Sequence, residues 1–378
     1  MSARGRVCLY VPFLYPVVSG GKVPFAGGIE VQLSLLARGL AARGFDVSVV
    51  TCDYGQPDGL VVDGVRLLKC WPPDAGLPVV RFFHPRLSTT ISALRRADAD
   101  VYLFQGAAMG AGLVYDVARL MGRRFLFMVG HDHDVLPELP DVFGPRDRWW
   151  YRRALTGADL VVSQTRKQQD ALRLGFGVPS EVVMNPVDMP TDQASPADSR
   201  RVVWLATYKE SKRPDWFLRF AERHPDVECE MAGVIPVPPL TDEHYRAALA
   251  LAEKLPRFRA HGTIPHEKIG EFLKGAALFT HTSPAEGFPN AFLEAWSWGL
   301  PTLTCFDPDG IIVRERLGER HDDYEGWEAA VLRWLEDPAM RRDAGQRARA
   351  YAGRTHASGE IHDRLATLID GLVARRGR

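Results

Sequence analysis

Short apolar runs alternate with segments of helical periodicity along almost the whole chain of 378 residues. Runs such as Val7–Val11, Val47–Thr51 and Val101–Phe104 have the length of buried strands, and the segments between them place apolar residues on one helical face. Strands covered by helices on both faces belong to parallel sheets, whereas the strands of a sandwich alternate polar and apolar residues. The sequence therefore predicts an α/β protein made of parallel β/α units.

The same pattern locates the other elements. Further strands are expected at Val65–Cys70, Phe125–Val129, Leu160–Ser163, Val182–Asn185, Val202–Ala206, Val227–Ala232, Arg257–Ala260, Leu278–Thr280 and Thr302–Cys305. Helices are expected at Ile29–Arg43, Leu113–Met121, Arg146–Leu155, Arg166–Leu174, Pro214–Glu222, Asp242–Lys254 and His266–Lys274, with a last segment, Pro338–Arg375, that is helical throughout.

A polar segment with three prolines, Pro186–Arg200, divides this pattern into two halves, and the alternation restarts after it. The length of the chain also suits two domains better than one core. We therefore expect two Rossmann-like, doubly wound domains, residues 1–185 and 186–355, that face one another across a cleft. Ligands of such sheets bind beyond the carboxyl ends of the strands, so the chemistry is expected in that cleft.

The composition argues against several classes of protein. Lys+Arg and Asp+Glu are 47 each, so a formal net charge of zero provides no global basic field for nucleic acid or an anionic membrane. Five cysteines form no C-x-x-C pair, which favours reduced, buried thiols and a cytoplasmic location. Pro12 and Pro16 interrupt the apolar start, and no apolar run reaches the roughly 18 residues of a membrane span. Peripheral contact with the inner face of a membrane is left open.

The segment Glu286–Pro301, EGFPNAFLEAWSWGLP, places two carboxylates eight residues apart around a loop-to-helix junction. Glu286 is expected in the loop and Glu294 inside the helix, with Pro289 in its first turn. Backbone N–H groups at a helix start bind anions, helped by the positive end of the helix dipole. A diphosphate on those amides, with sugar hydroxyls on the two carboxylates, describes a nucleotide-sugar. The alternative is an ordinary amphipathic helix with Glu294 in water.

The whole string resembles the E-x7-E signature of retaining glycosyltransferases of family 4. The match covers Glu286, Gly287, Phe288, Pro289, Asn290, Glu294, Ala295, Gly299 and Pro301. The resemblance implies the GT-B fold, in which a C-terminal helix, residues 356–378 here, returns to the first domain. It also implies a donor site in which Glu286 holds hydroxyls of the sugar, the Gly287 and Phe288 amides hold the phosphates, and Glu294 holds the ribose. Pro289 and Asn290 belong to the same donor-binding segment.

The segment Tyr208–Pro214 follows the first strand of the second domain, so its cations are expected at the carboxyl edge of that sheet. It corresponds to the family's G-R-x-x-x-x-K, whose Arg and Lys bind the diphosphate. Lys212 matches the Lys and is the candidate for leaving-group stabilisation. The Arg position falls on Thr207, a departure from the family pattern, and Lys209 is the candidate replacement. Solvated surface charge is the alternative.

Gly27 and Gly28 open the first long helix, where glycine lets a ligand approach the backbone closely. They resemble the family's G-G-x-E, whose loop amides meet the donor phosphate or the acceptor, although a tight turn explains two glycines equally well. Ile264 follows the strand Arg257–Ala260, where the family reads the nucleotide base with backbone groups. Such contacts leave the base undecided, with uridine favoured by frequency.

The tetrad His131–Asp134 comes directly after the strand Phe125–Val129. The family often has a His at this point, so His131 is the candidate for contacting a sugar hydroxyl or a developing positive charge, with Asp132 second. A structural His is the alternative. The tetrad also suits a cation, and it contains the D-x-D of metal-dependent transferases. That pattern recurs at Asp98–Asp100 and Asp307–Asp309, so it carries little information, and we expect neither a metal nor a cofactor.

Together these residues predict a metal-independent, retaining glycosyltransferase of the hexosyltransferase type, with His131, Lys212 and Glu286 as catalytic residues. It would move a sugar from a nucleotide-diphosphate sugar, with UDP favoured, to an acceptor hydroxyl in bacterial polysaccharide or glycoconjugate biosynthesis. A nucleotide-sugar epimerase or hydrolase on the same scaffold is the first alternative, and a non-catalytic nucleotide-sugar-binding protein is the second. Nucleic acid is not an expected partner.

The acceptor stays unassigned, because the segments expected near it follow no known motif. These are the loop Pro12–Phe25 and the aromatic and basic run Arg146–Arg153. Within that run, Trp149 and Trp150 could stack on sugars or lie against a membrane beside the arginines. Burial on an amphipathic helix is the favoured interpretation of the two tryptophans.

Overall fold

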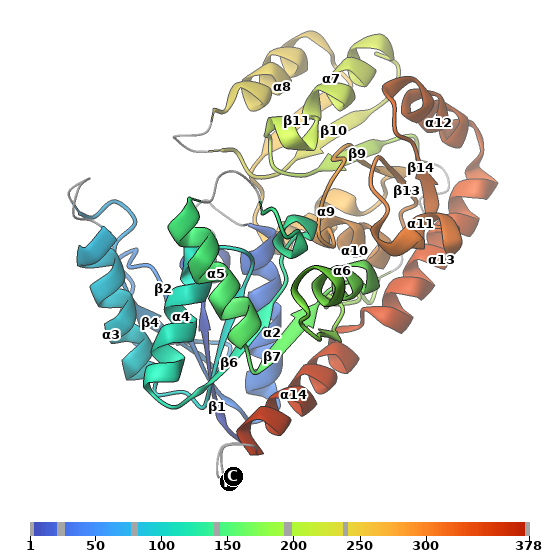
Figure 1. Cartoon of the computed structure of the whole chain (residues 1–378). Coiled ribbons are helices and arrows are strands. Elements are labelled where there is room, and N and C mark those ends of the chain that lie inside the picture. Colours follow the sequence, from blue (N-terminus) through green and yellow to red (C-terminus); the bar gives the residue numbers. More distant parts are fainter. Residues whose placement is uncertain are drawn as a thin grey trace. The chain divides into compact units, whose positions relative to one another are not determined.

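The computed structural model describes residues 4–20, 27–76, 82–139, 144–192, 199–236 and 241–374. These residues form two compact units (Figure 1). Unit 1 combines the segment up to Pro186 with the segment from Ser358 onward, and unit 2 is Val187–Ala357. The sequence analysis places the two borders after residues 185 and 355. The loop Pro12–Phe25 is described as far as Gly20, and its remainder lies outside the described residues.

Unit 1 is an α/β structure around one sheet. Its elements are β1 (Arg6–Tyr10), α1 (Leu14–Val18), α2 (Gly28–Ala42), β2 (Asp46–Thr51), β3 (Leu60–Val62), β4 (Val65–Lys69), the irregular turn η1 (Phe82–Leu87), α3 (Ser88–Ala97), β5 (Val101–Gln105), α4 (Met109–Leu120), β6 (Arg124–Met128), the 3-10 turn η2 (Asp132–Val135), α5 (Pro145–Gly157), β7 (Leu160–Ser163), α6 (Arg166–Phe176), β8 (Glu181–Val182) and α14 (Ser358–Ala374).

The sheet of unit 1 has the strand order β3-β4-β2-β1-β5-β6-β7-β8, and among the described pairs only β3 with β4 is antiparallel. From β4 to β7 this is a doubly wound order that reverses direction between β1 and β5. The predicted parallel β/α class of the first half is therefore confirmed. β3 and α3 were not predicted. Asp63 and Gly64 join β3 to β4 with φ of 50° and 78°, the two left-handed residues of a tight hairpin turn.

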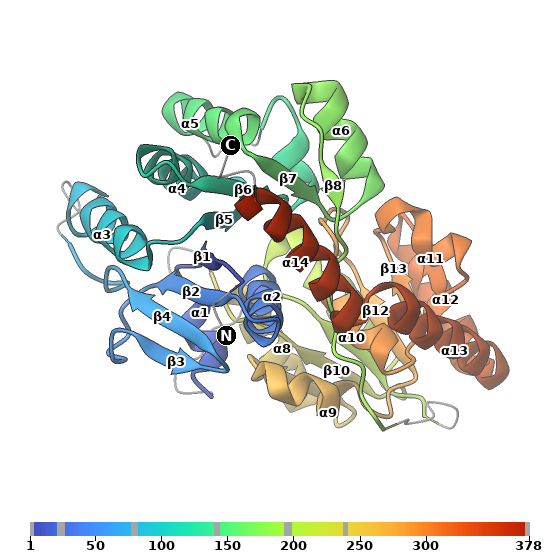
Figure 2. The ribbon, with the colours of Figure 1, turned by 90° about the horizontal axis from the view of Figure 1, so that it is seen from below.

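The two faces of this sheet form two core clusters, because side chains alternate along each strand. In β1, Val7 and Leu9 belong to one cluster, and Cys8 and Tyr10 belong to the other. Residues of α2 and α14 cover the first face, and residues of α3, α4 and α5 cover the second. Figures 1 and 2 show α14 running beside α2, although the two helices are the first long helix and the last one in the sequence. The apolar stripe of α14 that this contact buries consists of Ile361, Leu365, Ala366, Ile369 and Leu372.

A glycine allows α2 and α14 to approach closely. A Cβ atom at Gly39 would lie 2.3 Å from Cγ and Nδ1 of the buried His362. We expect Gly39→Ala to lower the free energy of unfolding by about 1 to 2 kcal/mol, because overpacking outweighs the gain in helix propensity. Gly371→Ala in α14 is the matched control, since a Cβ there meets no atom within 4 Å and should stabilise slightly. Urea unfolding of the three proteins measures this, and equal stability of the two variants would contradict the packing argument.

Unit 2 is a second α/β structure. Its elements are β9 (Val202–Leu205), the 3-10 turn η3 (Glu210–Lys212), α7 (Pro214–Arg223), β10 (Cys229–Ala232), α8 (Glu243–Lys254), β11 (Phe258–Gly262), the 3-10 turn η4 (His266–Lys268), α9 (Ile269–Leu273), β12 (Leu278–His281), α10 (Asn290–Ser297), β13 (Thr302–Thr304), the 3-10 turn η5 (Pro308–Gly310), α11 (Ile311–Arg314), β14 (Gly318–Arg320), α12 (Tyr324–Glu336) and α13 (Pro338–Thr355).

The sheet of unit 2 has the order β11-β10-β9-β12-β13-β14, with every described pair parallel. This is the doubly wound order whose direction reverses between β9 and β12. The loops after these two strands therefore flank the crevice in which such sheets bind ligands. Both predicted Rossmann-like sheets are confirmed, and β14 is an additional edge strand that the sequence analysis did not predict.

Three predicted elements differ from the structure. The segment Pro338–Arg375 is not one helix, because α13 ends at Thr355 and α14 begins at Ser358. Between them the carbonyl of His356 accepts a hydrogen bond from Val187 N at 2.9 Å, and Ala357 forms a β-bridge with Val187. The segment His266–Lys274 divides into η4 and α9. The strand expected at Val182–Asn185 is found only as β8, which ends at Val182, and Asn185 beyond it accepts a hydrogen bond from Gln32 Nε2 at 2.7 Å.

Candidate active site

The helix of the Glu286–Pro301 segment is α10, and Glu294 lies inside it as predicted. Pro289 lies at the N-cap with ψ of 120°, so the prediction that it falls in the first helical turn is wrong by one residue. The side chain of Phe288 is buried against Trp296 and His356, with ring centroids 6.1 and 4.9 Å away. This packing holds Gly287 and Phe288 in the loop that precedes Asn290, the first residue of α10.

Glu286 lies in the loop between β12 and α10 and is 9% exposed. Its carboxylate forms an ion pair with the ammonium of Lys212, and its Oε1 lies 3.2 Å from Nε2 of His281. Burial by itself would raise the pKa of Glu286. The hydrogen bond from His281 and the positive charge of Lys212 outweigh that effect and hold the pKa far below its usual value. Glu286 is therefore a buried, ionised carboxylate at neutral pH.

His281 is the last residue of β12 and is buried. Burial lowers the pKa of His281, although the contact with Glu286 opposes this effect, so the ring is neutral at neutral pH. Its Nδ1 lies 3.3 Å from the hydroxyl of Thr304, which leaves the Nε2–H to donate to Glu286. His281 is not among the site residues predicted from the sequence. Its place at the carboxyl end of the strand expected at Leu278–Thr280 was the available signal.

The two lysines of the predicted diphosphate site follow β9. Thr207 and Lys209 form a tight turn in which Lys209 N donates to Thr207 O at 2.8 Å, and Lys212 ends η3. Desolvation of its ammonium, and then the charge of Lys212, lower the pKa of Lys209. Two ammonium groups, those of Lys209 and Lys212, thus lie near a single carboxylate, that of Glu286. An anion that binds beside them would reduce the repulsion between the two ammonium groups. The structure brings together two of the residues predicted for the donor site, Lys212 and Glu286, in an ion pair that was not predicted.

Hydrogen bonds from side-chain hydroxyl groups connect the loop after β9 to the loop after β12. Thr282 Oγ1 donates to Lys212 O at 2.6 Å and accepts from Trp204 Nε1 at 3.0 Å. Ser283 Oγ lies 3.3 Å from Ser211 O. These bonds span the point where the strand order of unit 2 reverses. They hold the lysine segment and Glu286 in a defined mutual geometry.

Glu294 points to a second histidine. Its Oε1 lies 2.9 Å from Nε2 of His266, the first residue of η4. Ile264 lies two residues before His266 in the loop after β11. Ile264, the candidate for contacting the base, and Glu294, the candidate for contacting the ribose, therefore lie in the same part of unit 2. Sequence reasoning did not find His266, because only tertiary structure brings it to Glu294.

The other predicted residues lie in unit 1. Gly27 is the N-cap of α2, and Gly28 is the first residue of that helix. A Cβ at Gly27 would lie 2.1 Å from Oε2 of Glu30, which shows that the side chain of Glu30 folds back over the first turn. His131 follows β6, and its Nδ1 accepts a hydrogen bond from His133 N at 3.1 Å. Its ring proton is therefore on Nε2 in the neutral form.

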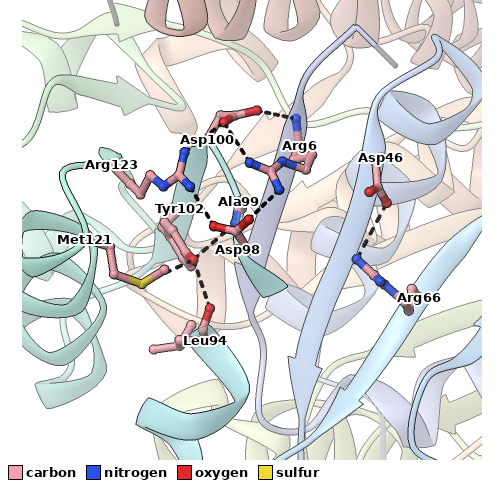
Figure 3. Close-up of polar contacts among 10 residues, drawn as sticks. All are labelled: Arg6, Asp46, Arg66, Leu94, Asp98, Ala99, Asp100, Tyr102, Met121 and Arg123. Carbon is pink, nitrogen blue, oxygen red and sulfur yellow. Dashed lines mark hydrogen bonds and ion pairs between the residues drawn. The ribbon is translucent and has the colours of Figure 1, made fainter. Parts of the chain in front are cut away.

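Each of the three D-x-D pairs is engaged by the protein. Asp132 accepts from Lys167 Nζ at 2.7 Å and Gln168 Nε2 at 3.0 Å, and Asp134 accepts from the backbone of Gly130 and His131. Figure 3 shows Asp98 and Asp100 in an ion-pair network with Arg6 and Arg123, at the amino end of β5. Asp307, the N-cap of η5, accepts from Ile312 N at 2.8 Å and from Val313 N at 3.2 Å in α11. Across the described ranges, no group of three or more His, Cys, Asp or Glu is arranged to hold a metal ion.

The two adjacent tryptophans of α5 separate. Trp150 is half-buried, and its Nε1 donates to Asp116 at 2.7 Å, whereas Trp149 is 61% exposed. The favoured interpretation, burial of both, is therefore wrong for Trp149. None of the helices in the part of the chain that the structure describes is long and apolar enough to cross a membrane.

Comparison with known proteins follows this division of the chain. The sequence model of the family "Glycosyl transferase 4-like domain" matches residues 27–188, and that of "Glycosyl transferases group 1" matches residues 188–351. The D-inositol 3-phosphate glycosyltransferase of Acidothermus cellulolyticus is 24% identical over 93% of this chain and 87% of its own length. One subunit of the human phosphatidylinositol N-acetylglucosaminyltransferase is 24% identical over 79% of this chain, which spans 61% of that relative.

Solved structures share the fold over nearly the full length. The sucrose-phosphate synthase of Thermosynechococcus elongatus superposes with a TM-score of 0.79 at 18% identity, covering 98% of this chain and 99% of its own. Anabaena HepE in complex with UDP and glucose has a TM-score of 0.72 at 14% identity, covering 97% and 99%. At these identities the likeness shows the fold alone.

Proposed function

The chain belongs to the glycosyltransferases of family 4, and from that membership we propose that it transfers a sugar from a UDP-sugar to an acceptor hydroxyl with retention of anomeric configuration. Glycosyltransferase activity on a GT-B scaffold is common to the family. The donor, the stereochemistry and a metal-independent reaction are our proposal. The observation that carries it is the contact of Lys212 and His281 with the buried carboxylate of Glu286, beside the start of α10.

When the donor binds, its diphosphate would replace Glu286 as the ion-pair partner of Lys212. With the ammonium drawn to the phosphates, the carboxylate accepts hydrogen bonds from hydroxyls of the donor sugar instead. As the glycosidic bond breaks, negative charge gathers on the diphosphate. Lys212, Lys209, the Gly287 and Phe288 amides and the positive end of α10 would stabilise that charge more in the transition state than in the ground state.

The electrostatics of Glu286 favour this role over general-base catalysis. A carboxylate whose pKa is held far below its usual value accepts a proton poorly and is a weak nucleophile. This argues against Glu286 as the proton-exchanging residue that the hydrolase and epimerase alternatives need. In the proposed reaction, the leaving phosphate would accept the acceptor's proton on the same face of the sugar, which retains the configuration.

Residues of unit 1 would complete the reaction. His131 in its Nε2–H form is suited to donate a hydrogen bond to a sugar hydroxyl, since its Nδ1 is already used by His133 N. Gly27 and Gly28, at the start of α2, would offer backbone to the donor phosphate or the acceptor. Ile264 and Asn290 would flank the nucleotide in unit 2.

UDP is the proposed nucleotide because HepE, which has the same fold, is known in complex with UDP and with UDP-glucose. The bacterial relative is named for transfer to an inositol phosphate, and the human relative for transfer to phosphatidylinositol. Both names describe transfer to an acceptor that contains inositol. For this chain we propose transfer to an acceptor hydroxyl in bacterial polysaccharide or glycoconjugate biosynthesis.

The test is thermal stability against UDP, GDP, ADP and their common sugar conjugates, for the parent chain and for Glu294→Ala. A ligand at about 100 times its Kd adds about 2.7 kcal/mol, enough to raise Tm by a few degrees. We expect a response to UDP and a UDP-sugar that Glu294→Ala loses and the exposed control Glu253→Ala keeps. The same response in EDTA, and NMR of the anomeric proton of the product, then test metal independence and retention. A protein that is folded but stabilised by none of these ligands would overturn the donor site.

A further inference from the structure

The outer face of α5 carries a concentration of arginine and aromatic side chains that the donor chemistry does not use. A surface groove of about 540 Å³ lies along this face (Figure 1 labels α5). The residues that line it recur at helical spacing and are Pro145, Arg148, Trp149, Arg152, Arg153 and Thr156. All the described residues that line the groove therefore belong to α5 in unit 1.

Packing of the core does not account for this face. The opposite side of α5 supplies the core with Tyr151, Ala154 and Leu155, all buried. Trp150 points toward α4 and bonds Asp116. Trp149, by contrast, is 61% exposed, which is unusual for a side chain of its size. Trp and Arg are enriched in binding surfaces, so their combination here suits an interaction surface.

This face carries four arginines and fewer acidic residues among the described positions, in a chain whose formal net charge is zero. Arg146, Arg148, Arg152 and Arg153 lie within eight consecutive residues. Asp147 partners Arg146, and Asp116 partners Arg153. The guanidinium of Arg153 also lies 5.7 Å from the Trp149 ring centroid. The face thus presents a cationic rim around one large aromatic ring.

A second exposed aromatic residue adjoins this face. The guanidinium of Arg146 stacks over the ring of Phe82 in η1 at 4.9 Å, and Phe82 contacts Phe83 edge to face at 5.0 Å. Phe83 is 65% exposed. Two projecting aromatic side chains, Trp149 and Phe83, therefore accompany the arginines.

We propose that this face docks unit 1 on an anionic phospholipid surface. Arginines would bind lipid phosphates while the two aromatic rings enter the boundary between headgroups and acyl chains. A soluble anionic saccharide would satisfy the arginines but leave Phe83 in water, so the aromatic pair favours a bilayer. The inference goes beyond the proposed transfer reaction and rests on none of its residues.

The experiment is flotation of the full chain with vesicles of phosphatidylcholine alone and with vesicles that also contain phosphatidylglycerol. We expect binding to the anionic vesicles alone. Arg148→Gln with Arg152→Gln should weaken it about 30-fold, since each basic residue near an anionic surface contributes about 1 kcal/mol. Arg95→Gln with Arg173→Gln, which removes the same charge from exposed positions on α3 and α6, should leave it unchanged. Acyl-chain brominated lipids should quench tryptophan fluorescence in the parent and not in Trp149→Phe.

Three outcomes would overturn the docking surface: no binding to anionic vesicles, equal loss in the two arginine pairs, or binding without quenching through Trp149. The last would indicate purely electrostatic attraction, such as a soluble polyanion also exerts. The UDP-dependent rise in Tm, measured on the same variants, reports the donor site separately and checks that each variant is folded. A chain that responds to UDP but ignores the vesicles would refute docking alone.

Discussion

Replacing Lys212 by alanine is expected to lower the rate of sugar transfer about 10²- to 10³-fold, the usual loss when one charge-stabilising group of a transition state is removed. The reason lies in its position. Lys212 is held beside Glu286 at the carboxyl edge of the unit 2 sheet, where the leaving diphosphate is proposed to gather charge. Steady-state kinetics with the donor identified by thermal stability measures the effect. We expect kcat to fall more than KM rises, because the charge grows in the transition state.

Two variants make this result specific to Lys212. Lys212→Arg keeps the charge and should retain a larger fraction of the rate than the alanine variant, although its planar group fits a different geometry. Lys254→Ala removes a lysine from the exposed end of α8 and should leave the rate unchanged. Loss of rate in Lys254→Ala, or full activity of Lys212→Ala, would show that Lys212 does not stabilise the leaving group.

Glu286→Gln should abolish most of the transfer and also lower the free energy of unfolding by about 3 kcal/mol at neutral pH, because it leaves Lys212 without its buried counter-charge. The pH dependence follows from the lowered pKa of Glu286. A carboxyl group whose folded pKa lies below its unfolded value of about 4.3 contributes its full stability above about pH 4.3 and loses it as the pH falls further. The difference between parent and variant should stay constant from neutral pH to about pH 5 and shrink below that.

Denaturant unfolding of the parent, Glu286→Gln, Lys212→Met and the double variant measures this coupling. Removing both partners should cost less than the sum of the single changes, since no buried charge is then left alone. A Glu286→Gln variant that is more stable than the parent at neutral pH would contradict the expectation. It would show that the buried charges of Glu286 and Lys212 lower the free energy of unfolding.

The architecture could be predicted because both sheets are parallel and buried except for the β3–β4 pair, so strands and helices appear in the sequence as alternating apolar runs and amphipathic segments. The elements that were missed are those whose identity depends on few residues. β3 has only three residues, and the Asp63–Gly64 turn was its only strong signal. The break between α13 and α14 depends on the bridge between Ala357 and Val187, residues far apart in the sequence.

The candidate site was predictable where a loop and a helix are contiguous in sequence, and not where loops meet in space. Glu286 and Glu294 belong to one segment and could be selected from it. His281 and His266, which contact their carboxylates, come from the end of β12 and from the turn after β11. The tryptophans of α5 show the same limit. Adjacent helical residues point about 100° apart, and only the contact with α4 decides which of Trp149 and Trp150 is buried.

The pairing of α14 with α2 has a consequence for how this chain is synthesised. Domains usually fold in the order in which they leave the ribosome, the N-terminal one first. Here α2 appears early, but the apolar stripe that covers it, from Ile361 to Leu372, is translated only after all of unit 2. Unit 2 is one continuous segment and can complete its sheet while unit 1 still exposes an uncovered face. The N-terminal unit of the nascent chain therefore stays incomplete until α14 has been translated. A chaperone would be expected to bind the face that α14 later covers.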